Sequence, residues 1–158
     1  MSNSINNIVY YDFPWSKGEL YFNPQDQLIK LNFYLTSPIL EKNCYISPNS
    51  VKFIKELSIY FSGEKITFSV PINLDGCTAY RRNVYQVLVK SATYGKTITY
   101  KELSLIAGGS PRSIGQAMKH NPIGIVIPCH RVVGSSGLGG FSGGLEVKKY
   151  LVNLERRN

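Results

Sequence analysis

A cysteine flanked by proline, histidine and arginine is the feature of this chain best suited to chemistry. Residues 127–132 have the sequence IPCHRV and end an apolar run. Only a thiolate is a strong sulfur nucleophile, and His130 and Arg131 are neighbours expected to lower the pKa of the Cys129 thiol. Adjacent side chains in an extended strand point apart, so Cys129 and His130 can cooperate only if Pro128 begins a turn. The motif indicates a nucleophilic cysteine with a base beside it.

Three other interpretations of Cys129 compete with this one. Free cysteine is among the most buried residue types, but a structural thiol gains nothing from a His-Arg pair that must be desolvated. The chain has no Cys-x-x-Cys and only His120 and His130 to supply nitrogen, so we expect no metal. A cysteine protease needs a remote histidine, and the only remote one is His120, on a helix that we assign to another role.

The basic charge of the chain is confined to its second half. Residues 1–78 contain 6 Lys+Arg and 7 Asp+Glu, a net charge of −1, whereas residues 79–158 contain 12 and 3, a net charge of +9. A neutral half followed by a basic half predicts two domains, which we place at residues 1–76 and 77–158. The basic domain is expected to face a polyanion such as a nucleic acid.

The ends and cysteines of the chain suggest where it works. The N-terminus is polar and no apolar stretch reaches membrane-spanning length, so we expect no signal peptide and no membrane partner. Three widely spaced cysteines, Cys44, Cys77 and Cys129, argue against a secreted disulfide framework and fit the cytoplasm. A Cys44–Cys77 bridge stays open at this point.

The first half is predicted to be mixed α/β. Alternating apolar residues and turn formers predict strands over 7–13, 19–22, 27–34 and 65–70, a helix over 50–61 with Ser50 as its N-cap, and a linker over 71–76.

The second half is predicted to be mostly helical. Apolar spacing and capping residues indicate helices over 78–91, 100–107, 111–120 and 145–157. Gly108 and Gly109 suit an αL exit, and Ser110-Pro111 suits the start of the next helix, which together outline a helix-turn-helix. A glycine at position 115 suggests close approach of another helix or of a nucleic-acid groove. Residues 134–144 contain six glycines and form either a surface loop or a backbone wall against a ligand.

These residues resemble the O6-alkylguanine–DNA alkyltransferase family. The resemblance is carried by Pro128-Cys129-His130-Arg131-Val132, by the preceding Asn121-Pro122 and by the following Ser142-Gly143-Gly144-Leu145, and it covers residues 80–155. It implies an α+β protein with a small ribonuclease H-like N-terminal domain. A mostly helical C-terminal domain with a helix-turn-helix is expected to follow.

The family's catalytic residues transfer to this chain by position. The resemblance implies that Cys129 accepts the alkyl group from O6 of guanine, with O4-alkylthymine as a second candidate substrate. His130 would deprotonate the thiol through a water, Glu155 would orient His130, and Asn121 would tie the helix over 111–120 to the cysteine turn. Tyr100 would protonate N3 of the leaving guanine. A thioether has no carbonyl for water to attack, so we expect one turnover per molecule and no cofactor.

The resemblance also implies contacts with duplex DNA containing O6-alkylguanine, made by a monomer. Arg112 would fill the gap left by the extruded base, and the Val132 backbone with Ser142 would hold the guanine edge. Phe141 replaces the usual tyrosine of the ring wall and lacks its hydroxyl. The remaining candidate DNA contacts are Ser113, Gly115, Lys119, Arg81, Lys101 and Ser135. Some relatives carry a zinc in the first domain, but this chain has no histidine there.

Two non-enzymatic hypotheses remain beside the enzyme. A non-catalytic binder of alkylated DNA, like the alkyltransferase-like proteins, would lack the acceptor cysteine, so Cys129 itself counts against it. A helix-turn-helix regulator with a buried cysteine would predict a thiol of ordinary pKa and a dimer.

Overall fold

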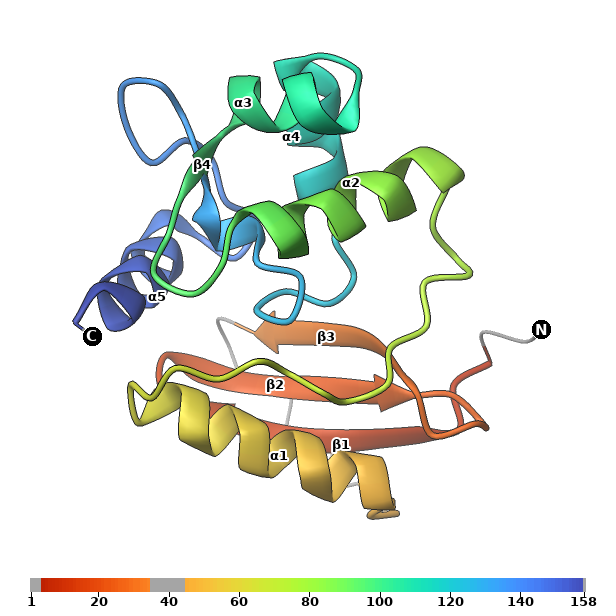
Figure 1. Ribbon diagram of the computed structural model, residues 1–158. Helices are drawn as coiled ribbons and strands as arrows, with labels where there is room; N and C mark the ends of the chain where they lie inside the picture. The colour runs from red at the N-terminus through yellow and green to blue at the C-terminus, as the bar shows by residue number, and fades with distance from the viewer. Residues whose placement is uncertain (1–3, 35–44, 158) are drawn as a thin grey trace. The chain divides into compact units, whose positions relative to one another are not determined.

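Three strands precede the first helix and the helices dominate the rest of the chain, which confirms the α+β class. The computed structural model describes residues 4–34 and 45–157, and the chain divides into two compact units, Met1–Gly76 and Cys77–Asn158 (Figure 1). Cys44 lies outside the described residues, so the structure does not test a Cys44–Cys77 bridge. No helix in the described ranges is long and apolar enough to cross a membrane.

The first unit is a three-stranded antiparallel sheet with one helix. Strands β1 (Asn7–Phe13), β2 (Ser16–Phe22) and β3 (Leu28–Tyr34) pair in that order, and helix α1 (Pro48–Phe61) runs along the sheet (Figure 1). The register aligns Val9, Leu20 and Leu31 across the three strands, so one buried apolar row crosses the sheet.

The start of α1 differs from the sequence-based expectation. Ser47, not Ser50, is the N-cap, and Pro48 occupies the first turn, where its missing N–H costs nothing. Ser50 instead completes a capping box, because its hydroxyl accepts from the Ser47 backbone while its own N–H donates to Ser47. The predicted N-cap was wrong because two serines three residues apart play reciprocal roles.

The segment after α1 also differs. Residues 65–70, predicted as a strand, form none, because the backbone N–H groups of Ser69 and Val70 donate to the Glu56 carboxylate rather than to a neighbouring strand. The predicted linker over 71–76 touches the edge of β3 at one point: Ile72 forms an isolated parallel bridge with Leu28, with hydrogen bonds of 2.8 and 3.0 Å.

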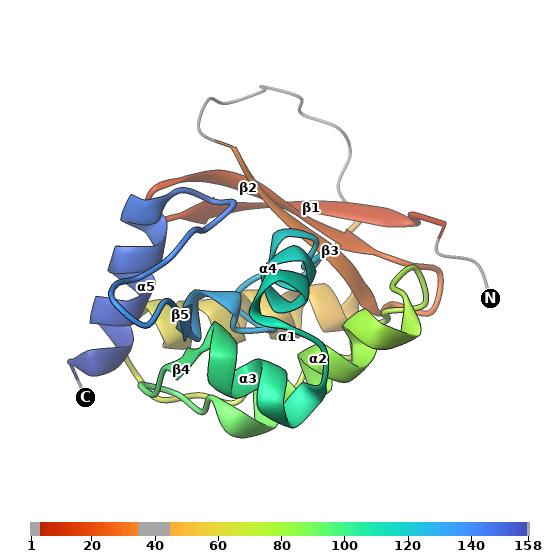
Figure 2. The ribbon, with the colours of Figure 1, turned by 90° about the horizontal axis from the view of Figure 1, so that it is seen from above.

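The described part of the second unit contains four α-helices, one turn of 3₁₀ helix and a very short parallel strand pair. The helices are α2 (Ala79–Ser91), α3 (Tyr100–Ala107), α4 (Pro111–Lys119) and α5 (Leu145–Arg156). Strands β4 (Ile98–Thr99) and β5 (Val132–Val133) pair with each other, and α5 lies beside β5 (Figure 2). The sequence analysis missed this pair because two-residue strands carry no periodicity.

A tight glycine turn joins α3 to α4. Gly108 and Gly109 have φ of 87° and 90°, but the ψ of 165° at Gly108 is extended rather than the predicted αL value. A Cβ at Gly109 would collide with the Tyr80 hydroxyl and the Ser113 hydroxyl. Ser110 caps α4 as predicted, through a capping box with Ser113.

We expect Gly109→Ala to lower the free energy of unfolding by about 1–3 kcal/mol, because alanine strains this backbone and meets two hydroxyls. Urea denaturation measures the effect. The control is Gly137→Ala, where no atom of the described residues lies within 4 Å of the new Cβ. Equal effects of the two substitutions would contradict the role assigned to the turn.

Candidate active site

Cys129 sits in the turn that its chemistry requires. Pro128 has φ −80° and ψ 62°, and Cys129–Arg131 form one turn of 3₁₀ helix, η1, closed by a 2.9 Å bond from the Arg131 N–H to the Pro128 carbonyl. With three residues per turn, consecutive side chains leave in different directions. Cys129 lines a pocket, while His130 and Arg131 reach the same carboxylate.

That carboxylate belongs to Glu155 of α5. Its Oε1 lies 2.7 Å from His130 Nε2 and accepts from an Arg131 terminal nitrogen at 2.9 Å, while its Oε2 accepts from Arg131 Nε at 2.8 Å. The Gly95 N–H also donates to Oε2 at 3.1 Å, and Arg131 donates to the Ala92 carbonyl at 2.7 Å. The three side chains are buried, so they form one desolvated ion and hydrogen-bond network.

The network fixes the charge of each member. Burial alone would raise the pKa of Glu155, but the hydrogen bonds from His130 and Arg131 hold it well below its ordinary value. Burial lowers the pKa of His130, against the opposing pull of Glu155. The ring is therefore neutral near pH 7, with Nε2–H donating to an ionised carboxylate and the lone pair on Nδ1.

The expected effect on the thiol is confirmed only for His130, which lowers the pKa of Cys129 through a backbone hydrogen bond and not through its ring; Arg131 does not contribute. Burial raises the pKa of Cys129, because only 6% of the residue is exposed, so its resting form is the thiol. The Arg131 guanidinium points toward the Glu155 carboxylate and pairs with it. A neutral His130 ring contributes no positive charge near the thiol. The side chains that lower the pKa of Cys129 are Asn121, through a hydrogen bond, and Lys148, through its charge.

Asn121 connects the end of α4 to the cysteine turn. Its Nδ2 donates to the Ile127 carbonyl at 2.8 Å, and its Oδ1 accepts from the Ile123 N–H at 3.0 Å. Ile127 lies two residues before Cys129, so the amide bridges the ends of the intervening segment.

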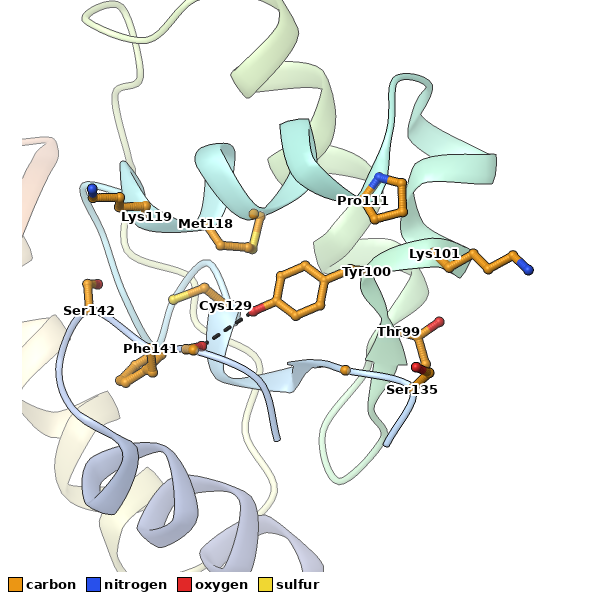
Figure 3. Close-up of a pocket in the computed structure, with 13 residues that line it drawn as sticks. Thr99, Tyr100, Lys101, Pro111, Met118, Lys119, Cys129, Ser135, Phe141 and Ser142 are labelled. Atoms are coloured by element: carbon orange, nitrogen blue, oxygen red, sulfur yellow. Dashed lines mark hydrogen bonds between the residues drawn. The ribbon is translucent and has the colours of Figure 1, made fainter. Parts of the chain in front are cut away.

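Eight of the sequence-predicted residues surround one pocket of about 780 Å³. They come from α3, α4, η1 and the segment 134–144, and are Tyr100, Lys101, Gly115, Lys119, Cys129, Ser135, Phe141 and Ser142. Figure 3 shows the Tyr100 ring reaching across the pocket toward Cys129. Its hydroxyl donates to the Gly140 carbonyl at 3.3 Å, and burial raises its pKa.

Four predicted contacts lie outside this lining. Arg112 is exposed on α4, and Arg81 lies in the first turn of α2. The Ser113 hydroxyl is engaged with Ser110 and with Tyr80, at 2.7 Å from the Tyr80 hydroxyl. Val132 is fully buried and its carbonyl accepts from Lys148.

The surface at Gly115 is open. No atom of the described residues lies within 4 Å of a Cβ built there. The suggested contact with another helix is therefore wrong, and this face of α4 is left free at the pocket.

Sequence reasoning missed Lys148, and a signal for it was present. Its side chain is fully buried, and it precedes Glu155 by seven residues, so both lie on the same face of α5. Met118 and Pro111 also line the pocket without having been predicted. Among the described residues no group of three His, Cys, Asp or Glu could hold a metal.

The comparisons with known proteins identify this arrangement. The family model for the DNA-binding domain of 6-O-methylguanine DNA methyltransferase matches residues 79–157. The chain belongs to the 6-O-methylguanine DNA methyltransferase family. The resemblance seen in the sequence is confirmed, and the match spans every residue of the Glu155 network and the pocket.

Individual methyltransferases are similar over most of the chain. A methylated-DNA–protein-cysteine methyltransferase of Saccharolobus islandicus is 38% identical over 73% of this chain and 76% of its own length. One from Metallosphaera sedula is 42% identical over 66% and 67%. The crystal structure of Mycobacterium tuberculosis OGT in complex with DNA has a TM-score of 0.81 and 31% identity, covering 95% of this chain and 93% of that one.

We expect Glu155→Gln to lower the free energy of unfolding by about 3 kcal/mol at pH 7, because it removes the charge that compensates buried Arg131. The folded-state pKa of Glu155 is depressed, so its contribution is present above pH 4.5, the ordinary glutamate pKa, and is lost as pH falls below it. Urea midpoints from pH 3 to 7 should therefore fall less steeply in Glu155→Gln than in the unmodified protein.

The matched control is Glu146→Gln, which removes an exposed carboxylate from the same helix. It should change stability by less than about 0.5 kcal/mol. A Glu155→Gln protein with the stability and acid sensitivity of the control would contradict the network.

Proposed function

We propose that this protein repairs DNA by moving an alkyl group from O6 of guanine to the Cys129 sulfur. The observation that carries the proposal is a buried cysteine that lines a pocket, next in sequence to a neutral histidine held by an ionised glutamate. A buried thiol with a raised pKa needs a base, and His130 has a lone pair to accept the proton.

The chemical step is a displacement at carbon. His130 takes the thiol proton, through a water, and Glu155 stabilises the imidazolium that forms. The sulfur forms a bond to the alkyl carbon as the bond from that carbon to O6 breaks. The electron pair goes to the guanine, and Tyr100 donates a proton to N3 of the departing base. The product is a thioether at Cys129, so each molecule reacts once.

The base must leave the duplex to reach Cys129, because O6 lies inside the stack. We assign DNA binding and alkyl transfer to the second unit, with α3 and α4 acting as a helix-turn-helix and Arg112 filling the gap in the duplex. The exposed Arg112, the Lys101 and Lys119 at the pocket rim and the open Gly115 surface support this assignment.

The fold comparison for the first unit, the oligomeric state, the cellular location and the contacts with the flipped base belong to the same proposal. The ribonuclease H-like comparison for the first unit, a monomeric state and a cytoplasmic location all stay predictions. Ser135, Phe141 and Ser142 would contact the flipped base from segment 134–144, on the pocket side where they lie. A non-catalytic binder of alkylated DNA is disfavoured by the presence of Cys129 and its base.

The proposal predicts a mass increase of one methyl group on a single peptide after incubation with O6-methylguanine DNA. The modified peptide should contain Cys129, and the peptide containing the partly exposed Cys77 should stay unchanged as an internal control. Cys129→Ala should bind the DNA but acquire no methyl group. Binding of the DNA by the unmodified protein without any mass shift would support the non-catalytic binder instead.

We expect Arg112→Ala to slow repair of duplex DNA about 10-fold while leaving reaction with free O6-benzylguanine within about 2-fold, since only the duplex requires base flipping. Single-turnover rates on both substrates measure the difference. Lys90→Ala, which removes an exposed cation from the last turn of α2, is the control for lost charge alone. Equal losses on the two substrates would refute the flipping role of Arg112.

A further inference from the structure

A fully buried lysine contacts the backbone of the pocket lining. The Lys148 side chain comes from α5, and its Nζ donates to the Val132 carbonyl at 2.6 Å and to the Gly140 carbonyl at 3.1 Å. Lysine is almost never fully buried unless it is paired. This ammonium is therefore held by two backbone carbonyls from different parts of the site.

One carbonyl belongs to the short strand β5 that follows the Cys129 turn, and the other belongs to the glycine-rich segment of the pocket lining. Val132 lies three residues after Cys129 and is anchored by pairing of β5 with β4. Gly140 lies in the glycine loop, residues 134–144, which contributes Ser135, Phe141 and Ser142 to the pocket lining. Six glycines in eleven residues make this loop costly to order, because glycine loses the most backbone freedom on folding.

Contacts of the loop converge around Gly140. The Tyr100 hydroxyl donates to the same carbonyl at 3.3 Å, and Figure 3 shows this bond crossing the pocket. The neighbouring Gly139 lies against the Tyr100 ring, since a Cβ there would come within 2.9 Å of Cε2. Lys148 Nζ lies 5.9 Å from the centre of that ring. The charge-assisted bond from Lys148 is the stronger of the two polar anchors.

We propose that Lys148 is a positioning residue that ties the glycine loop to the Cys129 turn and thereby shapes the wall against which the guanine is held. This inference rests on the proposed function for its substrate, but the tether itself is a property of the free protein. Loss of the tether should release the loop without removing the thiol or its base.

A purely electrostatic role is the competing explanation. Burial lowers the pKa of Lys148 to about 8, against an opposing effect of Cys129, and Lys148 in turn acts on the pKa of both Cys129 and His130. If charge alone mattered, losing Lys148 would reduce the thiolate population and slow every reaction of Cys129 alike. The tether predicts different effects on reactions that need the loop and those that do not.

The experiment compares Lys148→Met, Lys148→Gln and Lys149→Met. Methionine keeps the stem without a donor, glutamine keeps a donor without the charge, and Lys149 is an exposed neighbour on the same helix. The rate of Cys129 alkylation is measured for each protein with two reagents, O6-benzylguanine and iodoacetamide. Iodoacetamide alkylates an accessible thiolate without needing a pocket for the base. Hydrogen exchange followed by mass spectrometry reports the protection of residues 134–144, and circular dichroism checks the fold.

We expect Lys148→Met to slow reaction with O6-benzylguanine by about 10- to 100-fold, because the base is no longer held in register with the sulfur. Its iodoacetamide rate should be unchanged or increased, and exchange in residues 134–144 should rise. Lys148→Gln should recover part of the benzylguanine rate and of the protection, and Lys149→Met should behave like the unmodified protein. If Lys148→Met fails to fold, Lys148→Gln against Lys149→Met carries the same comparison of rates and loop protection.

Parallel losses in both rates, with a higher pH midpoint for iodoacetamide and unchanged loop protection, would overturn the tether in favour of charge. Unchanged rates and exchange would remove any role for Lys148. The proposed function would be refuted if the unmodified protein were inert toward both O6-benzylguanine and O6-methylguanine DNA. If Lys148→Met still increased hydrogen exchange in residues 134–144, the tether would stand without that function.

Discussion

Both oxygens of the Glu155 carboxylate are occupied by the two residues that follow Cys129 in the chain. His130 and Arg131 converge on it from η1, and the Gly95 N–H reaches it from the segment after α2. A buried carboxylate is tolerated only when its charge is compensated and its lone pairs are used. This one junction therefore links α2, η1 and α5.

The same junction gives His130, Arg131 and Cys129 different roles in the site. The Arg131 guanidinium pairs with Glu155, and burial keeps His130 neutral and Cys129 protonated near pH 7. A thiol that is inactive at rest is protected from unwanted reagents, and becomes a nucleophile when its proton can move to the histidine. From the same face of α5, Lys148 anchors the pocket wall, so one helix supports both the base and the binding surface.

Local sequence rules predicted much of the fold. They were least reliable where contacts with distant residues determine the backbone conformation or the charge of a side chain. The start of α4 followed from Ser110 and Pro111, because caps act within a few residues. The absent strand over 65–70 could not be foreseen, since its backbone N–H groups bind Glu56 from α1. The charge states of the site were also out of reach, because Arg131 neighbours Cys129 in sequence but binds Glu155, 24 residues away.

The tautomer of His130 tests the account most directly. Two-bond ¹H–¹⁵N correlation spectra should show a neutral ring protonated at Nε2 near pH 7, because the pKa of His130 is lowered from its ordinary value. His120, the only other histidine, donates from Nδ1 to the Gln116 carbonyl at 2.8 Å and provides a reference with the opposite proton position when it is neutral. A His130 ring that is doubly protonated near pH 7, or protonated at Nδ1 instead of Nε2, would contradict a neutral base held by Glu155.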